Sequence, residues 1–372
     1  MIYRKYGNTG LDVSVIGFGG MRFPDQENVE QASTLVKAAY DAGINYFDTA
    51  IGYGKSEELF GAAFKEMKKT RAQKPFYVSS KTFAADESSV RKDLETSLTR
   101  MGLDYLDFYH VWCLISPQAW KERQAGGVLK AFEKIKAEGL VKHIVVSTHM
   151  SGDDSAAMFD DYPFDGVLLG YSAMNFSYRE SAVAAAAAKK MGVVVMNPLG
   201  GGIIPQNPDR FGFVKTQKDE TVVEGALRFL VNDPRISVVL VGLSTLDQLA
   251  QTVKAVDGFK PISPEAIGEI RTNVKAAFNE MCTGCQYCDG CPENIPIPKL
   301  MDAYNHYMIS GNADDMVNRL KWHWSINPSD AYWKKCVECG KCEGECTQHL
   351  SIIKRLKEMT TLIDAHVVAH PQ

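Results

Sequence analysis

Residues 45–81 read NYFDTAIGYGKSEELFGAAFKEMKKTRAQKPFYVSSK, so a β-rich run, a helix-length segment and a second β-rich run follow one another. This order recurs between residues 15 and 256. The β-rich runs occupy residues 14–18, 45–48, 76–81, 106–110, 143–147, 166–170, 193–196 and 237–241. The helical segments include residues 30–42, 56–69, 88–101, 128–138, 181–191 and 221–231, and a further helix is expected at 265–279. Such units in series predict a closed parallel barrel, the (β/α)8 or TIM fold of the α/β class.

The glycines after the first predicted strand argue against an open doubly wound sheet. Residues 17–20 read Gly-Phe-Gly-Gly and lack the third glycine of a dinucleotide phosphate loop, and no acidic residue follows at the usual distance. Upstream, residues 7–10 (Gly-Asn-Thr-Gly) lie between short apolar–polar runs and predict a hairpin turn. Such a hairpin would close the bottom of the barrel.

The composition is that of an ordinary globular protein. The 372 residues suffice for a barrel and a small appendage, and 45% are hydrophobic and 23% charged. A formal charge of -4 argues against a nucleic-acid partner or an anionic membrane surface, and no stretch approaches the roughly 20 apolar residues that span a bilayer. The first residues lack an apolar signal region, so we expect a cytoplasmic protein whose cysteines are thiols or metal ligands.

Of the 9 cysteines, all but Cys113 lie in the last quarter of the chain. They form two motifs, Cys-x2-Cys-x2-Cys-x2-Cys-Pro and Cys-x2-Cys-x2-Cys-x3-Cys, made of Cys282, Cys285, Cys288, Cys291, Cys336, Cys339, Cys342 and Cys346. Between the motifs, residues 298–308 and 314–322 have the pattern of helices. We therefore place a domain boundary near residue 280, with a barrel at residues 1–280 and a small, mainly helical domain at residues 281–372.

The spacing of these cysteines predicts two iron–sulfur clusters. Three cysteines at two-residue intervals present thiolates to different irons of one cluster, and the fourth cysteine of each motif characteristically binds the other cluster. One cluster would then be held by Cys282, Cys285, Cys288 and Cys346, and the other by Cys336, Cys339, Cys342 and Cys291. Two four-cysteine zinc sites are the alternative, although zinc sites normally combine separate pairs of ligands.

Four polar side chains fall at or just after the carboxyl ends of neighbouring predicted strands, where the catalytic groups of a barrel lie. They are Asp48, Tyr53, Lys81 and His110. Reduction of a carbonyl by hydride needs a proton for the alkoxide, and a phenol can give it if its pKa is lowered. We expect the Lys81 ammonium to lower the pKa of Tyr53 and Asp48 to hold that ammonium in place. His110 would orient the carbonyl oxygen by a hydrogen bond.

The string Phe-Asp-Thr-Ala-Ile-Gly-Tyr-Gly-Lys-Ser-Glu at residues 47–57, with Ser-Ser-Lys at 79–81 and Phe-Tyr-His at 108–110, resembles the aldo-keto reductases. The resemblance runs from about residue 3 to residue 256. It implies a barrel that binds NADP(H) or NAD(H), with Asp48, Tyr53, Lys81 and His110 as a catalytic tetrad. Carried over position by position, it implies cofactor-binding roles for Gly20, Met21, Arg22, Asp48, Ser147, Met196, Pro198, Leu199, Gly201, Gly242, Ser244 and Gln248.

Several of these positions depart from the family pattern. Thr148 stands where the family has an asparagine, Leu168 replaces a glutamine, and Met196 replaces the aromatic ring that stacks on the nicotinamide. Met196 is explained equally well as a core residue of its strand. Gln248 occupies a position that often carries a cation for the 2′-phosphate, so the choice between NADP and NAD stays open. The cysteine-rich part, at residues 281–357, resembles the helical ferredoxin module that binds two [4Fe-4S] clusters.

The two halves pose a redox problem, because nicotinamide carries two electrons as a hydride whereas each cluster carries one. We expect an oxidoreductase that reduces a small-molecule carbonyl, or oxidises an alcohol, with Tyr53 as general acid and the clusters as an appendage. In the alternative, the clusters relay single electrons from a ferredoxin-like partner to a substrate or a bound flavin, although the chain has no flavin motif. An electron-transfer subunit without barrel catalysis is disfavoured by the complete tetrad. The sequence leaves the substrate and the oligomeric state open.

Overall fold

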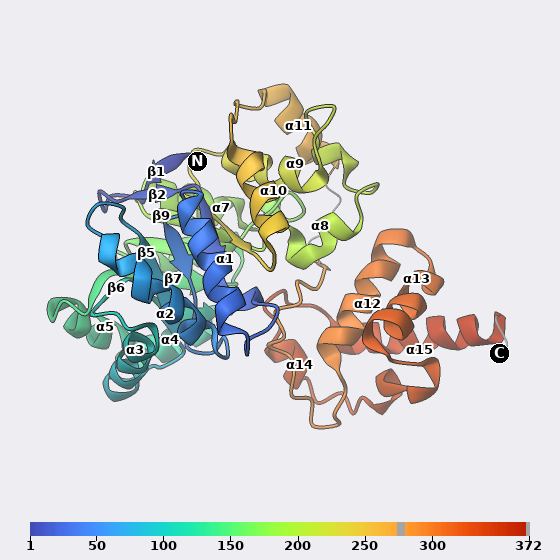
Figure 1. Cartoon of the computed structure of the whole chain (residues 1–372). Coiled ribbons are helices and arrows are strands. Elements are labelled where there is room, and N and C mark those ends of the chain that lie inside the picture. The colour runs from blue at the N-terminus through green and yellow to red at the C-terminus, as the bar shows by residue number, and fades with distance from the viewer. Residues whose placement is uncertain (274–279, 370–372) are drawn as a thin grey trace. The chain divides into compact units, whose positions relative to one another are not determined.

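The computed structural model describes residues 1–273 and 280–369, which form two compact units (Figure 1). The first unit comprises Met1–Leu199 and Phe211–Asn273, and the second comprises Gly200–Arg210 together with the described residues from 280 onward. The Gly200–Arg210 segment follows the seventh barrel strand in the chain, and the sequence pattern places it in residues 1–280. In the structure, this segment packs with the cysteine-rich part, and nothing in the sequence pattern predicts that packing.

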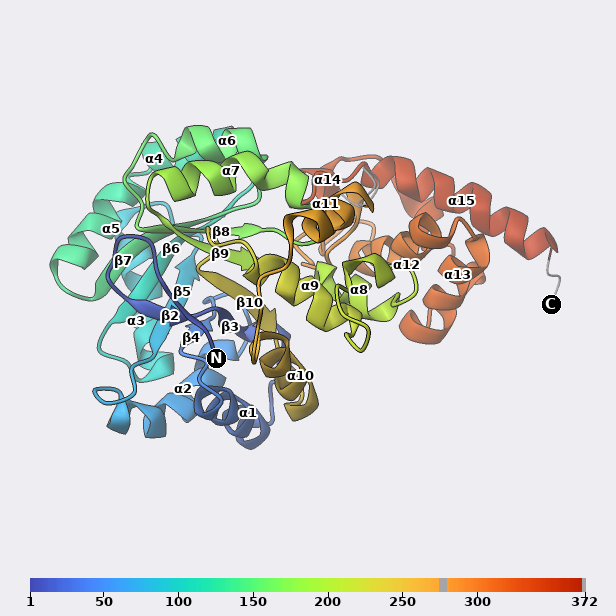
Figure 2. The ribbon, with the colours of Figure 1, turned by 90° about the horizontal axis from the view of Figure 1, so that it is seen from above.

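The first unit is a closed barrel of parallel strands. From β3 to β10, each strand pairs with the strand that follows it in the chain, and β10 pairs with β3 to close the barrel. The strands are β3 (Ile16–Gly19), β4 (Tyr46–Asp48), β5 (Tyr77–Thr82), β6 (Leu106–Leu114), β7 (Val141–Thr148), β8 (Gly166–Gly170), β9 (Gly192–Met196) and β10 (Val238–Gly242). Helices surround them (Figure 2). The predicted (β/α)8 barrel is therefore confirmed, with each predicted strand within a few residues of its expected place.

A two-stranded hairpin closes the bottom of this barrel, as expected. Its strands are β1 (Tyr3–Lys5) and β2 (Asp12–Ser14), which pair antiparallel. Between them, Tyr6 is fully buried among the barrel's inward-facing residues, and its ring centroid lies 4.2 Å from that of Phe108. A Cβ atom at Gly192, the first residue of β9, would lie 2.3 Å from the Tyr6 ring, so glycine makes room for the plug.

The barrel helices are α1 (Val29–Asp41), α2 (Ser56–Met67), α3 (Glu87–Met101), α4 (Pro117–Ala125), α5 (Val128–Ala137), α6 (Gly152–Met158), α7 (Phe176–Ala188), α9 (Val222–Val231), α10 (Leu246–Val256) and α11 (Pro264–Asn273). The sequence pattern misses α4 because only Trp120 of this helix is buried, so no apolar stripe marks it. It places the start of α7 five residues late, because the helix is kinked at Arg179. The helix expected at 265–279 ends at Asn273 in the described part, and residues 274–279 lie outside the described residues.

Arg179 fixes the loops that follow β7 and β8. Its guanidinium is fully buried and donates hydrogen bonds to the backbone oxygens of His149 (2.7 Å), Met150 (3.1 Å) and Gly170 (3.2 Å). Burial lowers the pKa of Arg179 to about 10, which still leaves the group charged at neutral pH. One side chain thus holds the backbone after two neighbouring strands.

Replacing Arg179 with methionine is expected to lower the free energy of unfolding by roughly 3 kcal/mol or more, because several buried carbonyls lose their donor at once. Methionine keeps much of the apolar stem, so lost packing contributes less. Chemical denaturation followed by circular dichroism measures the change. Arg91→Met, which removes ion pairs at the surface, is the matched control. An equal loss of unfolding free energy in the two variants would show that the hydrogen bonds of Arg179 do not stabilise these loops.

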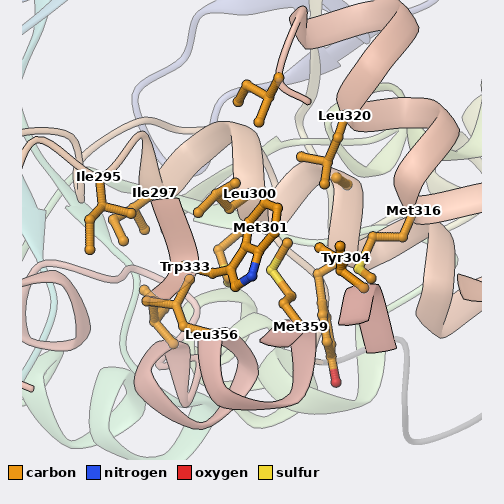
Figure 3. Packing of buried hydrophobic residues seen from close by; sticks show 14 of the residues in the cluster. Ile295, Ile297, Leu300, Met301, Tyr304, Met316, Leu320, Trp333, Leu356 and Met359 are labelled. Carbon is orange, nitrogen blue, oxygen red and sulfur yellow. The ribbon is translucent and has the colours of Figure 1, made fainter. Parts of the chain in front are cut away.

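The second unit is mainly helical, as predicted. It contains α8 (Ile203–Gln206), α12 (Ile297–Ser310), α13 (Ala313–Asn318), a π-helical turn (Arg319–His323), α14 (Lys341–Gly344) and α15 (Ile352–Ala369). Trp333 is buried at the centre of its core, beside residues such as Leu300, Met301 and Leu356 (Figure 3). Cys342 and Cys346 belong to the same core. None of the helices in residues 1–273 and 280–369 has the length and hydropathy of a membrane span.

Candidate active site and cysteine loops

The register of three neighbouring strands brings the predicted tetrad together. Asp48 at the end of β4 pairs with Ser79 of β5, and Lys81 of β5 pairs with His110 of β6. The Lys81 Nζ donates to Asp48 Oδ1 at 2.5 Å and to the backbone oxygen of Thr49 at 2.6 Å. The Asp48 and Lys81 side chains are at most 2% exposed. A buried carboxylate and ammonium pair therefore lies inside the top of the barrel.

Ser79 connects this pair to His110, and sequence analysis missed it. The Ser79 hydroxyl donates to Asp48 Oδ2 at 2.9 Å and lies 2.8 Å from His110 Nε2. Because the Ser79 hydroxyl donates its proton to Asp48, its oxygen is free to accept a hydrogen bond from His110 Nε2–H. This favours the His110 tautomer that carries its proton on Nε2. The available signal was the alternation of β5, since residues 79 and 81 lie on one face of a strand.

Tyr53 lies in the loop after β4, beside the charged pair. The Lys81 Nζ is 5.0 Å from the centroid of the Tyr53 ring. The opposite neighbour is Trp112, whose ring meets Tyr53 edge-on at 5.3 Å between centroids and stacks on Phe83 at 3.9 Å. A bulge in β6 between Val111 and Leu114 accompanies this placement of Trp112. The Tyr53 ring therefore has both the Lys81 ammonium and the Trp112 ring as close neighbours.

Burial acts on the ionisation of all three buried tetrad members. It raises the pKa of Asp48 and lowers the pKa of Lys81, while the charge of each opposes the shift of the other. Burial, followed by the charge of Lys81, lowers the pKa of His110 well below its ordinary value. His110 is therefore neutral at physiological pH and serves as a hydrogen-bonding group.

Activity is expected to fall on both sides of a pH window set by this network. With a raised pKa, Asp48 takes up a proton at higher pH than an ordinary carboxyl group and ceases to balance the ammonium. With a lowered pKa, Lys81 loses its proton at lower pH than an ordinary lysine, and its support of Tyr53 ends. The dependence of kcat/KM on pH measures both limbs, which belong to the coupled network. A profile that stays flat between about pH 5 and 10 would contradict this.

Several predicted cofactor residues gather between β10 and the turn after β3. Met21 and Arg22 lie in a 3-10 turn (Gly20–Arg22), and the Ser244 hydroxyl donates to the Arg22 backbone oxygen at 3.0 Å. A Cβ atom at Gly242 would lie 3.0 Å from Arg22 Cγ. The Gln248 side chain accepts from the Ser244 backbone N–H at 2.8 Å at the exposed start of α10. Gln248 thus caps an amide that the resemblance assigns to phosphate.

The remaining predicted cofactor residues of the first unit lie at other strand ends. Ser147 is buried in β7, and Met196 is half-buried at the end of β9, followed by Pro198 and Leu199. Gly20 is buried, and a Cβ atom there would lie 2.3 Å from the Phe60 ring, so its small size also serves the packing of α2. Leu168, at the position of the family glutamine, lies within the barrel core.

Gly201 lies in the second unit, against the first cysteine loop. Its φ is 69°, and a Cβ atom would lie 2.3 Å from the backbone oxygen of Thr283, the residue after Cys282. Both the backbone conformation and the space therefore require glycine. A residue that the resemblance assigns to the cofactor is in contact with a cysteine loop.

The two cysteine motifs share one backbone conformation at their starts. Gly284 (φ 65°) and Glu338 (φ 58°), each two residues after the first cysteine, are left-handed, and so are Gln286 (φ 68°) and Gly340 (φ 76°). The N–H of Gly284 donates to Cys282 Sγ, and that of Glu338 to Cys336 Sγ, both at 3.4 Å. Glu338 and Gln286 adopt this conformation without being glycine. The two loops therefore share a backbone conformation although their side chains differ, which suggests that both loops serve the same purpose.

Cysteines of the two motifs lie close to one another in a crossed pattern. Burial raises the pKa of Cys282 to about 12, and the charges of Cys285 and Cys346 act in the same direction. Cys285 Sγ is 3.3 Å from the hydroxyl of Thr347, next to Cys346. On the other side, burial raises the pKa of Cys342 to about 11, with further contributions that include the charges of Cys336 and Cys291. One cavity is lined by Cys288, Cys291, Cys336, Cys339 and Cys342.

Asn305 of α12, which sequence analysis missed, positions the first of these loops. Its buried amide accepts from the Cys282 N–H at 2.9 Å and donates to the Cys282 backbone oxygen at 2.8 Å. Within residues 1–273 and 280–369, no three His, Cys, Asp or Glu side chains converge closely enough to hold a single metal ion.

Comparison with known proteins identifies the barrel. A model of the aldo/keto reductase family matches residues 15–274, more than half of the chain. The chain belongs to the aldo/keto reductase family. This aldo/keto reductase is an oxidoreductase that also matches, at residues 281–351, the 4Fe-4S dicluster domain. Both resemblances predicted from the sequence motifs are thereby confirmed.

Relatives of this aldo/keto reductase extend over about three quarters of its chain. L-galactose dehydrogenase of Arabidopsis thaliana is 27% identical over 310 residues, which cover 74% of this chain and 95% of that protein. A probable voltage-gated potassium channel subunit beta of Oryza sativa subsp. japonica is 24% identical, with 74% and 97% covered. A solved aldo-keto reductase from Bacillus halodurans (holo form) has a TM-score of 0.64 at 23% identity and covers 74% of this chain and 97% of that one, which supports the fold.

Proposed function

We propose that the barrel reduces a small-molecule carbonyl, or oxidises the corresponding alcohol, with NADP(H) or NAD(H) and with Tyr53 as the proton donor or acceptor. The observation that carries the proposal is the buried Asp48–Lys81 pair, whose ammonium lies 5.0 Å from the Tyr53 ring centroid. A lysine is rarely buried without a partner, because burial disfavours its charge, and active sites are where such buried charges gather. Here the charge faces a phenol at the mouth of a barrel, where enzymes of this fold carry out chemistry.

Each member of the site has a separate task. When bound, the nicotinamide supplies or accepts the hydride. Tyr53 gives its proton to the carbonyl oxygen, and Lys81 stabilises the phenolate that remains. Asp48 and the backbone oxygen of Thr49 keep Lys81 in place through their hydrogen bonds. Neutral His110 has one ring N–H, so it donates to the carbonyl oxygen only in the state in which that proton is not given to Ser79.

The start of α10 suits a phosphate group of the cofactor. Backbone N–H groups are exposed at this end of an α-helix, and Thr245 caps it by accepting from the Gln248 N–H. Gln248 carries no charge, so the helix end offers hydrogen bonds but no side-chain cation at that position. Both NADP(H) and NAD(H) are compatible with this chemistry.

We also propose that the helical unit binds two [4Fe-4S] clusters with crossed ligand sets. The first ligand set is Cys282, Cys285, Cys288 and Cys346, and the second is Cys291, Cys336, Cys339 and Cys342. The match to a 4Fe-4S dicluster domain supports the number. The charges of Cys285 and Cys346 both act on Cys282, and all four members of the second set line one cavity together with Cys288. This proximity supports the crossing.

A second function is favoured by the contact between Gly201 and Thr283. In this alternative, a ferredoxin-like partner supplies single electrons, which the clusters pass to a substrate or a bound flavin. Gly201, which the family resemblance assigns to the nicotinamide cofactor, packs against Thr283, the residue after the proposed ligand Cys282. Hydride transfer remains the first proposal, because the complete tetrad performs proton-coupled hydride chemistry without any one-electron step.

An anaerobic assay separates the two functions. The holoprotein is reduced with dithionite, freed of excess reductant, and given a panel of aldehydes and ketones with and without NAD(P)H. Hydride transfer predicts product only in the samples that contain NAD(P)H. Product formed from the chemically reduced protein without nicotinamide would instead establish the electron relay.

A further inference from the structure

The two ligand sets differ in the hydrogen bonds that reach their sulfur atoms. In the first set, the N–H of Gly284 donates to Cys282 Sγ and the N–H of Leu350 to Cys346 Sγ, both at 3.4 Å. The Thr347 hydroxyl adds a third contact, at 3.3 Å from Cys285 Sγ. In the second set, Cys336 Sγ accepts from the Glu338 N–H at 3.4 Å. Among the described residues, the Thr347 hydroxyl is the side-chain donor beside a proposed ligand sulfur, and it belongs to the first set.

Thr347 is oriented to act as a donor. It is fully buried, and the Gln348 side chain donates to its Oγ1 at 3.3 Å. A cysteine that ligates iron is a thiolate and has no proton to give, so the hydrogen bond to Cys285 Sγ must come from Thr347. The corresponding position of the first motif, after Cys291, is Pro292, which has no side-chain donor. The two motifs therefore differ at the residue that follows the fourth cysteine.

Arg355 of α15 adds a positive charge on the same side. Its side chain is 6% exposed, and Nη2 donates to the backbone oxygen of Glu280 at 2.5 Å. Nη1 is buried and has no hydrogen-bond partner among the described residues. The Glu280 carboxylate lies 3.7 Å away, but it is 71% exposed and therefore screened by water. Glu280 lies two residues before Cys282, so this contact places the guanidinium beside the first cysteine loop.

The cavity of the second set is lined by charges of both signs, Glu345 and Lys341. The Lys341 ammonium donates to the Gly290 backbone oxygen at 3.2 Å, and the residue is exposed, so its charge is screened by water. Cys339 is exposed, as is Val337, at 61%. Water at this edge stabilises a reduced cluster to some extent, but a full buried charge acts through a lower dielectric constant and has the larger effect.

We infer that Thr347 and Arg355 raise the reduction potential of the cluster held by the first ligand set above that of the cluster held by the second. The inference rests on the proposed binding of two clusters with crossed ligands. Reduction adds one electron to a cluster and makes it more negative, so hydrogen bonds to its sulfurs and a nearby cation stabilise the reduced state. Thr347 and Arg355 do not bind iron themselves. They act on the reduction potential through the sulfur atoms and the charge of the cluster.

An anaerobic redox titration followed by electron paramagnetic resonance tests this on the full-length holoprotein. The wild type is expected to show two reduction steps, with the first ligand set reduced at the higher potential. Cys339→Ala, which removes an exposed ligand of the second set, assigns the signals. Thr347→Val keeps the shape of the side chain but removes the hydroxyl donor. It is expected to lower the ratio of reduced first to reduced second cluster about tenfold, which corresponds to a fall of 59 mV in the potential of the first cluster for one electron. Thr347→Ser should restore the wild-type value, and Arg355→Gln should lower the potential of the same cluster while Arg355→Lys retains it.

Iron and sulfide are measured on every sample, so that the two proposals fail separately. A wild type with fewer than about eight irons per chain would refute the two-cluster proposal. Full iron content with the second ligand set reduced first would overturn the inference and leave the clusters in place. The same holds if Thr347→Val and Arg355→Gln keep their iron and leave both potentials unchanged. The order of the two steps in the wild type decides the sign even if a variant fails to fold.

Discussion

Replacing Tyr53 with phenylalanine is expected to lower kcat for carbonyl reduction on the order of 10²–10⁴-fold. The substitution removes the proton that the alkoxide needs and leaves the ring, its edge-on contact with Trp112 and the Asp48–Lys81 pair intact. Because the hydroxyl acts on the transition state, binding of the nicotinamide cofactor should be unchanged. Steady-state kinetics with the best carbonyl substrate, together with fluorescence titration of the cofactor, measures both quantities.

The matched control for this variant is Tyr162→Phe. It deletes a phenolic hydroxyl of the same barrel that bonds Glu133 at the surface, 2.9 Å away. Its activity should equal that of the wild type. If Tyr53→Phe kept full activity, Tyr53 would not be the proton donor. If it lost activity only through weaker cofactor binding, the phenol would belong to the binding site instead.

Removing two cysteines at a time is expected to distinguish crossed from sequential cluster ligation. With crossed ligands, Cys285→Ala/Cys346→Ala damages one cluster and retains about four irons per chain. Cys285→Ala/Cys291→Ala damages both clusters and loses nearly all iron, because these two residues serve different ligand sets. Sequential ligation predicts the reverse for the two double variants. Iron and sulfide analysis after anaerobic purification reads the result directly.

Cys113→Ala is the control for the cysteine variants, because Cys113 lies in β6 of the barrel, outside both motifs. It should keep the iron content of the wild type. Retention of about four irons per chain in both double variants would contradict the crossed arrangement. Loss of all iron in both would show that each cluster depends on the other for folding, and single variants at Cys346 and Cys291 would then be compared.

The barrel could be predicted from the sequence because its strands are short β-branched runs at regular intervals, and patterns of that kind depend on local residues. The tetrad could be predicted for the same reason, since each member sits at the end of such a run. Ser79 could not be singled out, because a serine in a strand has no special meaning until Asp48 and His110 are known to face it. Arg179 was hidden for a similar reason, since its partners are backbone oxygens of three residues distant in the chain.

The cysteine domain shows the same division between local and long-range information. The spacing of the cysteines is local, so the sequence alone suffices to predict eight ligands. The contact of Cys285 with Thr347, the hydrogen bonds of Asn305 to Cys282 and the contact of Arg355 with Glu280 all join residues more than 20 positions apart. The transfer of Gly200–Arg210 to the second unit also depends on such a contact, because the space at Gly201 is set by Thr283.

The central claim is that the barrel moves a hydride. Its most direct test uses NAD(P)H carrying deuterium at C4 of the nicotinamide, with the holoprotein under anaerobic conditions and an aldehyde or ketone substrate in ordinary water. Mass spectrometry of the product alcohol locates the label. Hydride transfer predicts deuterium on the carbinol carbon for one of the two C4 faces. A product whose carbinol hydrogen comes entirely from water, with either face labelled, would contradict the claim and assign the reaction to single electrons.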